Sequence, residues 1–249
     1  MTMLSKLKKY IKNIILPDLT YKLYKTSYKL EKLGTDYGGW IIPIDIIQQR
    51  SICYLVGAGE DISFDVALSK RFNCNVFIFD PTPRSKAHFD KLIDAAQSGK
   101  TIFELGNTKY EVDKNIISHL QFKEIGIWKE ADVLKFFQPK DSTHISHSIT
   151  NIQDTDRFIE VRVEKLKTIM QSLGHDHLDI LKLDIEGAEF AVIDSIIDDK
   201  IDINVLCVEF HLSKEGGLEQ IQSTIRKLEK NNFAVIARDH YDFTFIKKR

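Results

Sequence analysis

The sequence predicts an α/β fold: a mostly parallel seven-stranded sheet that ends in a C-terminal antiparallel hairpin, with helices on both faces. From residue 52 onward, apolar runs typical of buried strands alternate with stretches of helical periodicity. Few polar residues interrupt the apolar runs, as strands covered on both faces require. The last two runs, FAVIARD and YDFTFIKK, stand so close together that only an antiparallel hairpin can join them.

The individual elements follow from the same patterns. Unbroken apolar runs predict strands at residues 52–59, 75–80, 121–130, 178–187, 203–211, 233–239 and 241–248. Apolar residues at helical spacing predict helices at residues 61–72, 85–97, 163–174, 188–197 and 218–231. Asp61 suits the N-cap of the first helix, and Gly174 suits the stop of the third. Residues 99–120 are predicted to form a short hairpin, and the polar residues 138–158 a loop or flap beside the ligand pocket.

Length and composition indicate a globular protein without a nucleic-acid partner. The chain has 249 residues, of which 43% are hydrophobic and 29% charged, and its formal net charge is −1. A net charge this close to zero creates no overall electrostatic field that would attract nucleic acid. Cys53, Cys74 and Cys207 lie in or beside apolar runs, which predicts buried, reduced thiols and a cytoplasmic location. The sequence contains no run of about 18 apolar residues, so it predicts no transmembrane helix.

The N-terminus differs from the rest of the chain in its excess of lysine. We expect residues 1–36 to form a basic helical extension and residues 37–249 to form the main domain. An amphipathic helix of this kind can pack on the domain with its lysines in solvent. The alternative is peripheral contact with an anionic membrane, at the inner membrane surface.

A glycine turn between the first strand and helix predicts a nucleoside site. Gly57 and Gly59 allow close approach of the backbone to a ligand, and a carboxylate at the end of the next strand can accept both ribose hydroxyls. Isoleucine replaces the third glycine of a pyrophosphate-binding turn, and two consecutive acids would repel a pyrophosphate. S-adenosylmethionine, a nucleoside with a cationic sulfonium, suits this turn better. The residues predicted to bind it here are Gly57, Ala58, Gly59, Glu60, Asp61, Asp80 and Pro81.

Ionisable residues end the fourth and fifth predicted strands. Alternation along the fourth strand places Lys182, Asp184 and Glu186 on one side. Glu209 and His211 end the neighbouring strand, so both strands direct polar groups to one crevice at the carboxyl edge of the sheet. Asp184, Glu186 and His211 are the predicted catalytic residues, with His211 as a base because an ordinary histidine titrates near neutral pH. Carboxylates are also the ligands that Mg²⁺ prefers, but we expect no metal.

The segments GAGEDISFD, FIFDPTP, LKLDIEGAEF and VEFH resemble the FkbM family of S-adenosylmethionine-dependent methyltransferases. The resemblance covers about residues 37–245 and implies a Rossmann-like class I methyltransferase that methylates hydroxyls of saccharides or glycans. It implies that Gly57 and Gly59 line the methionine part of the cofactor, that Asp80 holds the ribose, and that Asp184, also a cofactor-binding residue, and Glu186 face the methyl-transfer centre. It also places Gly126, Ile127 and Trp128 near the adenine, and Ser146–Thr150 on the acceptor side.

Two positions depart from that family's pattern. Leu55 stands where an acid often precedes the first glycine, and Asp61 replaces a later glycine. We expect Glu60 or Asp61 to bind the cofactor's amine in place of the missing acid.

Two rival functions remain compatible with the fold. One is an NAD-dependent oxidoreductase, which the acidic turn and the closing hairpin disfavour. The other is a non-catalytic domain that binds a glycan or a protein and retains a vestigial fold. For the leading function we expect a small-molecule or glycan acceptor, in a lipid-linked form if the N-terminus contacts membrane. The sequence leaves the oligomeric state open.

Overall fold

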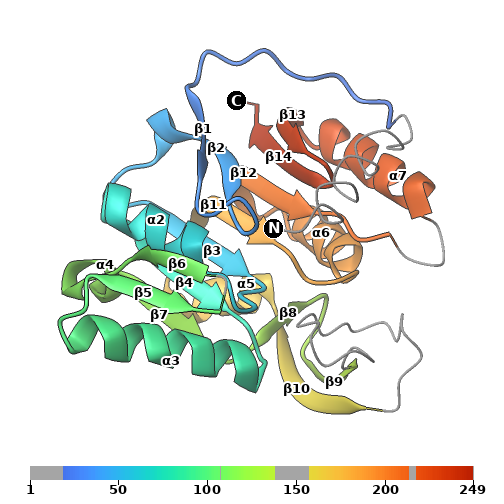
Figure 1. Ribbon diagram of the computed structural model, residues 1–249. Coiled ribbons are helices and arrows are strands. Elements are labelled where there is room, and N and C mark those ends of the chain that lie inside the picture. The colour runs from blue at the N-terminus through green and yellow to red at the C-terminus, as the bar shows by residue number, and fades with distance from the viewer. Residues whose placement is uncertain (1–18, 107, 138–156, 213–216, 249) are drawn as a thin grey trace, which may run out of the picture.

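The computed structural model describes residues 19–106, 108–137, 157–212 and 217–248, and a seven-stranded sheet is its centre (Figure 1). The order across this sheet is β13-β14-β12-β11-β3-β4-β7. The strands are β3 (Ile52–Val56), β4 (Asn75–Phe79), β7 (Leu120–Lys123), β11 (His177–Leu183), β12 (Asp202–Glu209), β13 (Phe233–Asp239) and β14 (Asp242–Lys247).

Strands β12, β11, β3, β4 and β7 run parallel to one another, whereas β14 is antiparallel to both β12 and β13. The chain builds outward from β3 through β4 to β7, and then returns to the other side of β3 to lay down β11 and β12. The strand order therefore reverses between β3 and β11. In open α/β sheets, ligands bind at the carboxyl ends of the strands at such a reversal.

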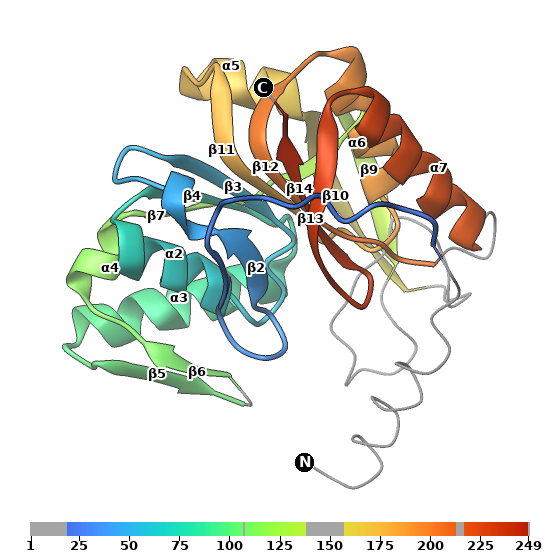
Figure 2. The same cartoon turned by 90° about the horizontal axis from the view of Figure 1, so that it is seen from above.

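Helices cover both faces of this sheet, and each face has its own apolar core (Figure 2). Helices α2 (Ser63–Phe72), α3 (Pro83–Gln97) and α4 (Lys114–Ser118) contribute side chains to one core. Helices α5 (Leu166–Leu173), α6 (Glu189–Asp198) and α7 (Gly217–Lys230) contribute to the other. The central strands are buried on both sides, which explains their unbroken apolar sequences. The three cysteines are buried free thiols.

The predicted α/β class is confirmed, but three small sheets accompany the large one. They consist of β1 (Leu30–Leu33) with β2 (Trp40–Pro43), β5 (Ile102–Leu105) with β6 (Thr108–Glu111), and β8 (Gly126–Trp128) with β9 (Asp132–Phe137) and β10 (Phe158–Lys165). In Figure 1 the last of these extends below the main sheet. A short 3-10 helix, η1 (Ile44–Ile46), follows β2.

Some predicted elements differ in detail. The predicted strand at 121–130 is two strands, because β7 pairs in the main sheet and β8 pairs with β10. The predicted helix at 163–174 begins at Leu166, since Val163–Lys165 complete β10. Within the predicted extension, residues 1–18 lie outside the described residues, and residues 30–33 form strand β1. In the described part of the chain, no helix is long and apolar enough to cross a membrane.

Candidate active site

The glycine turn lies directly against the end of β11. Gly57 has a φ of +84°, and a Cβ atom built there would lie 1.7 Å from the carbonyl oxygen of Asp184. Gly57 N donates to Phe79 O at 2.9 Å, and Asp184 N donates to Val56 O at 3.2 Å. Only glycine fits this position, because a side chain would enter the backbone of β11. The ends of β3, β4 and β11 are thereby fixed together.

Asp80 lies beside this turn as predicted, but its carboxylate is already saturated. Its Oδ2 accepts from Ala58 N at 3.0 Å, from Gly59 N at 3.2 Å and from Ser85 Oγ at 2.8 Å. Its Oδ1 accepts from Thr82 N at 2.8 Å and Thr82 Oγ1 at 2.6 Å. A carboxylate offers about four lone-pair sites, so these five donors leave none free for a ribose. In this arrangement Asp80 shapes the turn, and the ribose contact stays a prediction.

Both acids of the turn make local contacts, and the expected contact of Glu60 or Asp61 with the cofactor's amine stays a prediction. Glu60 accepts from Arg84 Nε at 2.8 Å. Asp61 accepts from Thr35 Oγ1 at 2.6 Å and from Ser63 N at 2.9 Å. The Asp61 contacts attach the loop between β1 and β2 to the start of α2. Both acids are therefore engaged in holding local structure.

Sequence analysis missed Asp65, which is 4% exposed in the first turn of α2. Its Oδ1 has no hydrogen-bond partner among the described residues. Burial raises the pKa of Asp65 to about 7, although the charge of Lys182 opposes the rise. Lys182 donates to Gly57 O at 2.6 Å and lies 3.1 Å from Asp184 Oδ2. The alternation of apolar and polar residues gives no sign that this one acid faces inward.

Asp65→Asn is expected to stabilise the protein by about 2–4 kcal/mol at pH 8 and to have little effect at pH 4. Because the folded-state pKa is raised from 3.8 to about 7, the charged form is penalised only in the folded protein. That penalty grows as pH rises and is complete above the folded pKa. Urea denaturation at both pH values measures it. Asp90→Asn, at an exposed site on α3, should change stability by less than about 0.5 kcal/mol at either pH. A loss of stability at pH 8 in Asp65→Asn would show that attraction to Lys182 outweighs burial.

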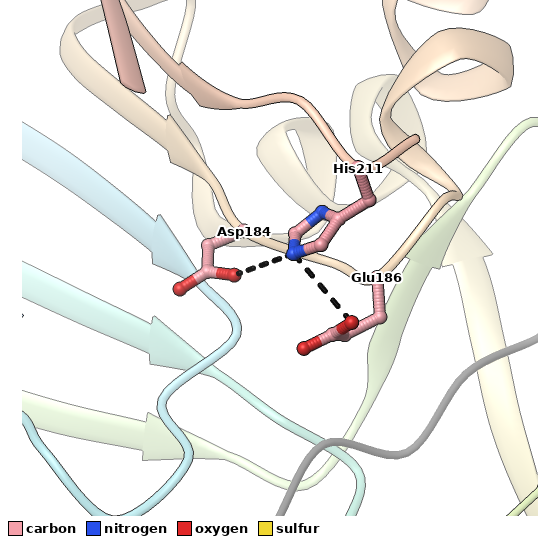
Figure 3. Close-up of side chains that lie close together, drawn as sticks. All are labelled: Asp184, Glu186 and His211. Atoms are coloured by element: carbon pink, nitrogen blue, oxygen red, sulfur yellow. Dashed lines mark ion pairs between the residues drawn. The ribbon is translucent and has the colours of Figure 1, made fainter. Parts of the chain in front are cut away.

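Asp184, Glu186 and His211 meet at the ends of β11 and β12, as the sequence predicted (Figure 3). His211 Nε2 lies 3.9 Å from Asp184 Oδ1 and 3.5 Å from Glu186 Oε2. Glu209 Oε1 is 3.7 Å from the same nitrogen. Three carboxylates therefore surround one imidazole nitrogen.

A fully buried glutamate accepts a hydrogen bond from the backbone of His211. Glu189, at the start of α6, is 0% exposed, and its Oε1 accepts from His211 N at 2.7 Å. Its other oxygen accepts from Gly187 N at 2.8 Å, which also fixes the loop that carries Glu186. Glu186 has a φ of +50°, an uncommon conformation for a residue other than glycine. The relative positions of the two strand ends thus depend on Glu189.

The surrounding charges change the expected role of His211. Burial alone would lower the pKa of His211, but the carboxylate of Glu189, whose Oε1 lies 3.5 Å from His211 Nδ1, and the charge of Glu186 outweigh burial and raise it to about 10. The raised pKa favours the protonated imidazole at neutral pH, a form that does not accept a proton. The expectation of a histidine base relied on an ordinary pKa, and this environment does not provide one. Burial and the charge of Asp184 raise the pKa of Glu209 to about 8.

The same three side chains place ligand atoms within 4.8 Å of one another, a donor set that could hold a divalent ion. The imidazolium already supplies a positive charge between the carboxylates. The sequence-based expectation of a metal-free site stays a prediction.

One cavity of about 1010 Å³ joins the glycine turn to the carboxylates. Its wall contains most of the predicted residues: Gly57, Ala58, Gly59, Glu60, Asp61, Asp80, Pro81, Ile127, Asp184 and Glu186. Trp128 is not in the wall, because its side chain packs against the core. Phe136 provides aromatic surface there instead, and Tyr37 and Trp40 add two aromatic residues that sequence analysis missed. The predicted acceptor-side segment Ser146–Thr150 lies outside the described residues.

Comparison with known proteins identifies the family. The sequence profile of the methyltransferase FkbM domain matches residues 56–235, which contain the glycine turn, Asp80 and the carboxylate cluster. A search of curated proteins gives no match. The profile covers well over half of the chain and confirms the resemblance in the motifs. This protein belongs to the FkbM methyltransferase domain family.

Proposed function

We propose that this protein transfers a methyl group from S-adenosylmethionine to a hydroxyl of a saccharide or glycan. The observation that carries the proposal is the single cavity that joins the glycine turn to Asp184 and Glu186. It lies where the strand order reverses, between β3 and β11. The antiparallel end of the sheet also fits a class I methyltransferase better than a dinucleotide dehydrogenase.

The residues of the cavity fit S-adenosylmethionine chemically. When bound, this cofactor supplies an electrophilic methyl group on a positively charged sulfur. The turn Gly57–Gly59 would hold its amino-acid part, and the half-buried Phe136 offers apolar surface to an adenine ring beside Ile127. Asp184 and Glu186 place negative charge at one end of the cavity, where a cation is stabilised and a pyrophosphate is not.

Asp184 is the residue best placed to act on the acceptor. Its backbone contacts the glycine turn, and its side chain forms part of the cavity wall. We assign it the hydrogen bond that orients the acceptor hydroxyl and receives its proton. His211 and Lys182 hold the Asp184 carboxylate from two sides, at 3.9 and 3.1 Å. Both act by positioning Asp184.

A saccharide acceptor is supported by the mouth of the cavity. Tyr37, in the loop between β1 and β2, is 87% exposed and belongs to the same cavity as the acids. An exposed aromatic ring beside carboxylates offers stacking to the apolar face of a sugar and hydrogen bonds to its hydroxyls. The contacts of Thr35 with Asp61 and Ser63 hold this loop in place.

Asp184→Asn is expected to reduce methyl transfer by about 10²–10⁴-fold, the usual contribution of a positioned proton acceptor. The assay follows tritium from methyl-labelled S-adenosylmethionine into a saccharide extract. Label in methyl ethers survives alkali, whereas label in methyl esters is released. Affinity for S-adenosylhomocysteine should change by less than about fivefold, because the turn is unaltered. Glu104→Gln, at an exposed residue of β5 that is not in the cavity wall, serves as the control.

Three results of that assay would contradict the proposal. Full activity in Asp184→Asn would remove this residue from the reaction. Alkali-labile label would indicate a carboxylate acceptor. Binding of S-adenosylhomocysteine without transfer to any saccharide would favour the vestigial, non-catalytic domain.

A further inference from the structure

Residues 22–30 form a surface segment, here called the N-terminal strip, whose exposed side chains are mainly apolar or positively charged. Leu23, Tyr24, Tyr28 and Leu30 are 55%, 46%, 40% and 36% exposed. Lys22, Lys25 and Lys29 are exposed between them, and the strip contains no acidic residue. Lys22 and Lys25 form no ion pair with any described residue. Single exposed apolar residues are ordinary, but four within nine residues are not.

The backbone of the strip is anchored, so the outward direction of these side chains is a fixed feature. Tyr24 N donates to Val235 O on β13 at 2.7 Å. Lys29 N donates to Asp45 Oδ2 at 2.7 Å, and Lys29 O accepts from Ile44 N at 3.0 Å. The strip is therefore attached to the domain at both ends, while the Leu23 and Tyr24 side chains point to solvent.

A groove adjoins the start of the strip, and its wall contains three basic residues, Arg226, Lys227 and Lys230, and one acid, Glu219. Figure 1 shows the N-terminal segment running from β1 across the edge of β13 and β14 toward α7. There Thr20 N donates a hydrogen bond to Gln222 Oε1 at 2.5 Å, and Gln222 Nε2 donates one to Thr20 O at 2.7 Å. The groove beside them has a volume of about 730 Å³, and the exposed Arg226 and Lys230 form part of its wall.

We propose that the N-terminal strip and this groove bind the surface of an anionic phospholipid membrane. Tyrosine prefers the membrane–water interface, exposed leucines can enter the acyl boundary, and lysine and arginine attract anionic headgroups. The charge pattern selects a lipid surface over a second copy of this chain, because two like-charged strips would repel each other. The strip lies outside the matched residues 56–235, so the inference does not depend on methyl transfer. If the proposed function also holds, the membrane would bring lipid-linked saccharides to the cavity.

The test is co-sedimentation of the full-length protein with vesicles. Wild-type protein is expected to bind vesicles of phosphatidylcholine with 30% phosphatidylglycerol, and to bind pure phosphatidylcholine vesicles at least tenfold more weakly. The triple variant Leu23→Ser, Tyr24→Ser, Tyr28→Ser and the double variant Lys22→Glu, Lys25→Glu should each reduce binding at least tenfold. Val133→Ser with Leu212→Ser, which changes exposed apolar residues elsewhere, should bind as the wild type does.

Each outcome decides the proposal. Equal binding by wild type and both strip variants would overturn it, and so would absence of wild-type binding to the anionic vesicles. A wild-type dimer that the triple variant converts to a monomer, without vesicle binding, would assign the strip to self-association. Urea denaturation of the same variants verifies that they fold, independently of cofactor binding. If the wild-type protein does not bind S-adenosylhomocysteine, the proposed function is refuted, but the result of the vesicle experiment is still valid.

Discussion

Gly57→Ala is expected to destabilise the protein by more than about 4 kcal/mol, a loss that few single substitutions produce. The added Cβ would lie 1.7 Å from Asp184 O, a backbone atom of the residue that directly follows β11, and β11 pairs with β3. A φ of +84° adds conformational strain. Relief of the clash requires β3 and β11 to move apart, which would open both the sheet and the site. Urea denaturation and titration with S-adenosylhomocysteine measure the two effects.

Gly59→Ala is the matched control. Gly59 has a φ of +54°, but a Cβ atom there would meet nothing within 4 Å. The variant should lose only about 1 kcal/mol, from the left-handed conformation itself. If both variants lost the same small amount, the close approach of Gly57 to β11 would be wrong.

Asp80→Ala is expected to destabilise the protein by about 3–5 kcal/mol, because it leaves buried donors without an acceptor. The amides of Ala58, Gly59 and Thr82 would all lose their partner. The glycine turn would no longer be held to the end of β4, so affinity for S-adenosylhomocysteine should fall with stability. Hydrogen exchange at these three amides would report the local loss directly.

Ser85→Ala removes one donor to Asp80, the hydroxyl at 2.8 Å, and leaves the three amides bonded. It should cost about 1 kcal/mol and leave cofactor affinity unchanged. An Asp80→Ala protein of wild-type stability that had lost only cofactor affinity would instead support the ribose contact, against the saturated carboxylate described above.

The central sheet could be predicted from sequence because its physical constraints are local. Strands buried on both faces must be apolar throughout, and the runs around Tyr54 and Leu206 obey that rule. The strands of the small sheets have no such continuous apolar sequence. Strand β9, Asp132–Phe137, is largely exposed, and its pairing with β10 depends on tertiary contacts 20 or more residues away. Its mixed sequence therefore fits a loop as well as a strand.

The sequence predicts where the site residues lie better than it predicts their protonation and hydrogen bonding. The sequence predicted a strand through residue 187 and grouped Asp184 with Glu186. The two acids do lie together, but β11 ends at Leu183 and Glu186 lies in a turn with a φ of +50°, so a turn that the sequence did not predict brings them together. The state of His211 depends on Glu189, which lies 22 residues earlier in the chain on another element. Likewise, the saturation of Asp80 depends on the Ser85 and Thr82 rotamers in a turn whose shape the sequence does not reveal. Protonation and hydrogen-bond occupancy are properties of the assembled site.

Calorimetric titration of the wild-type protein with S-adenosylhomocysteine tests the central claim most directly. We expect one binding site per chain, with Kd in the micromolar range, and no binding of NAD under the same conditions. Asp184→Asn should retain that site, because its glycine turn is unchanged. Absence of heat and of any thermal shift at millimolar S-adenosylhomocysteine, or tighter binding of NAD, would contradict the assignment of this cavity to a methyl donor.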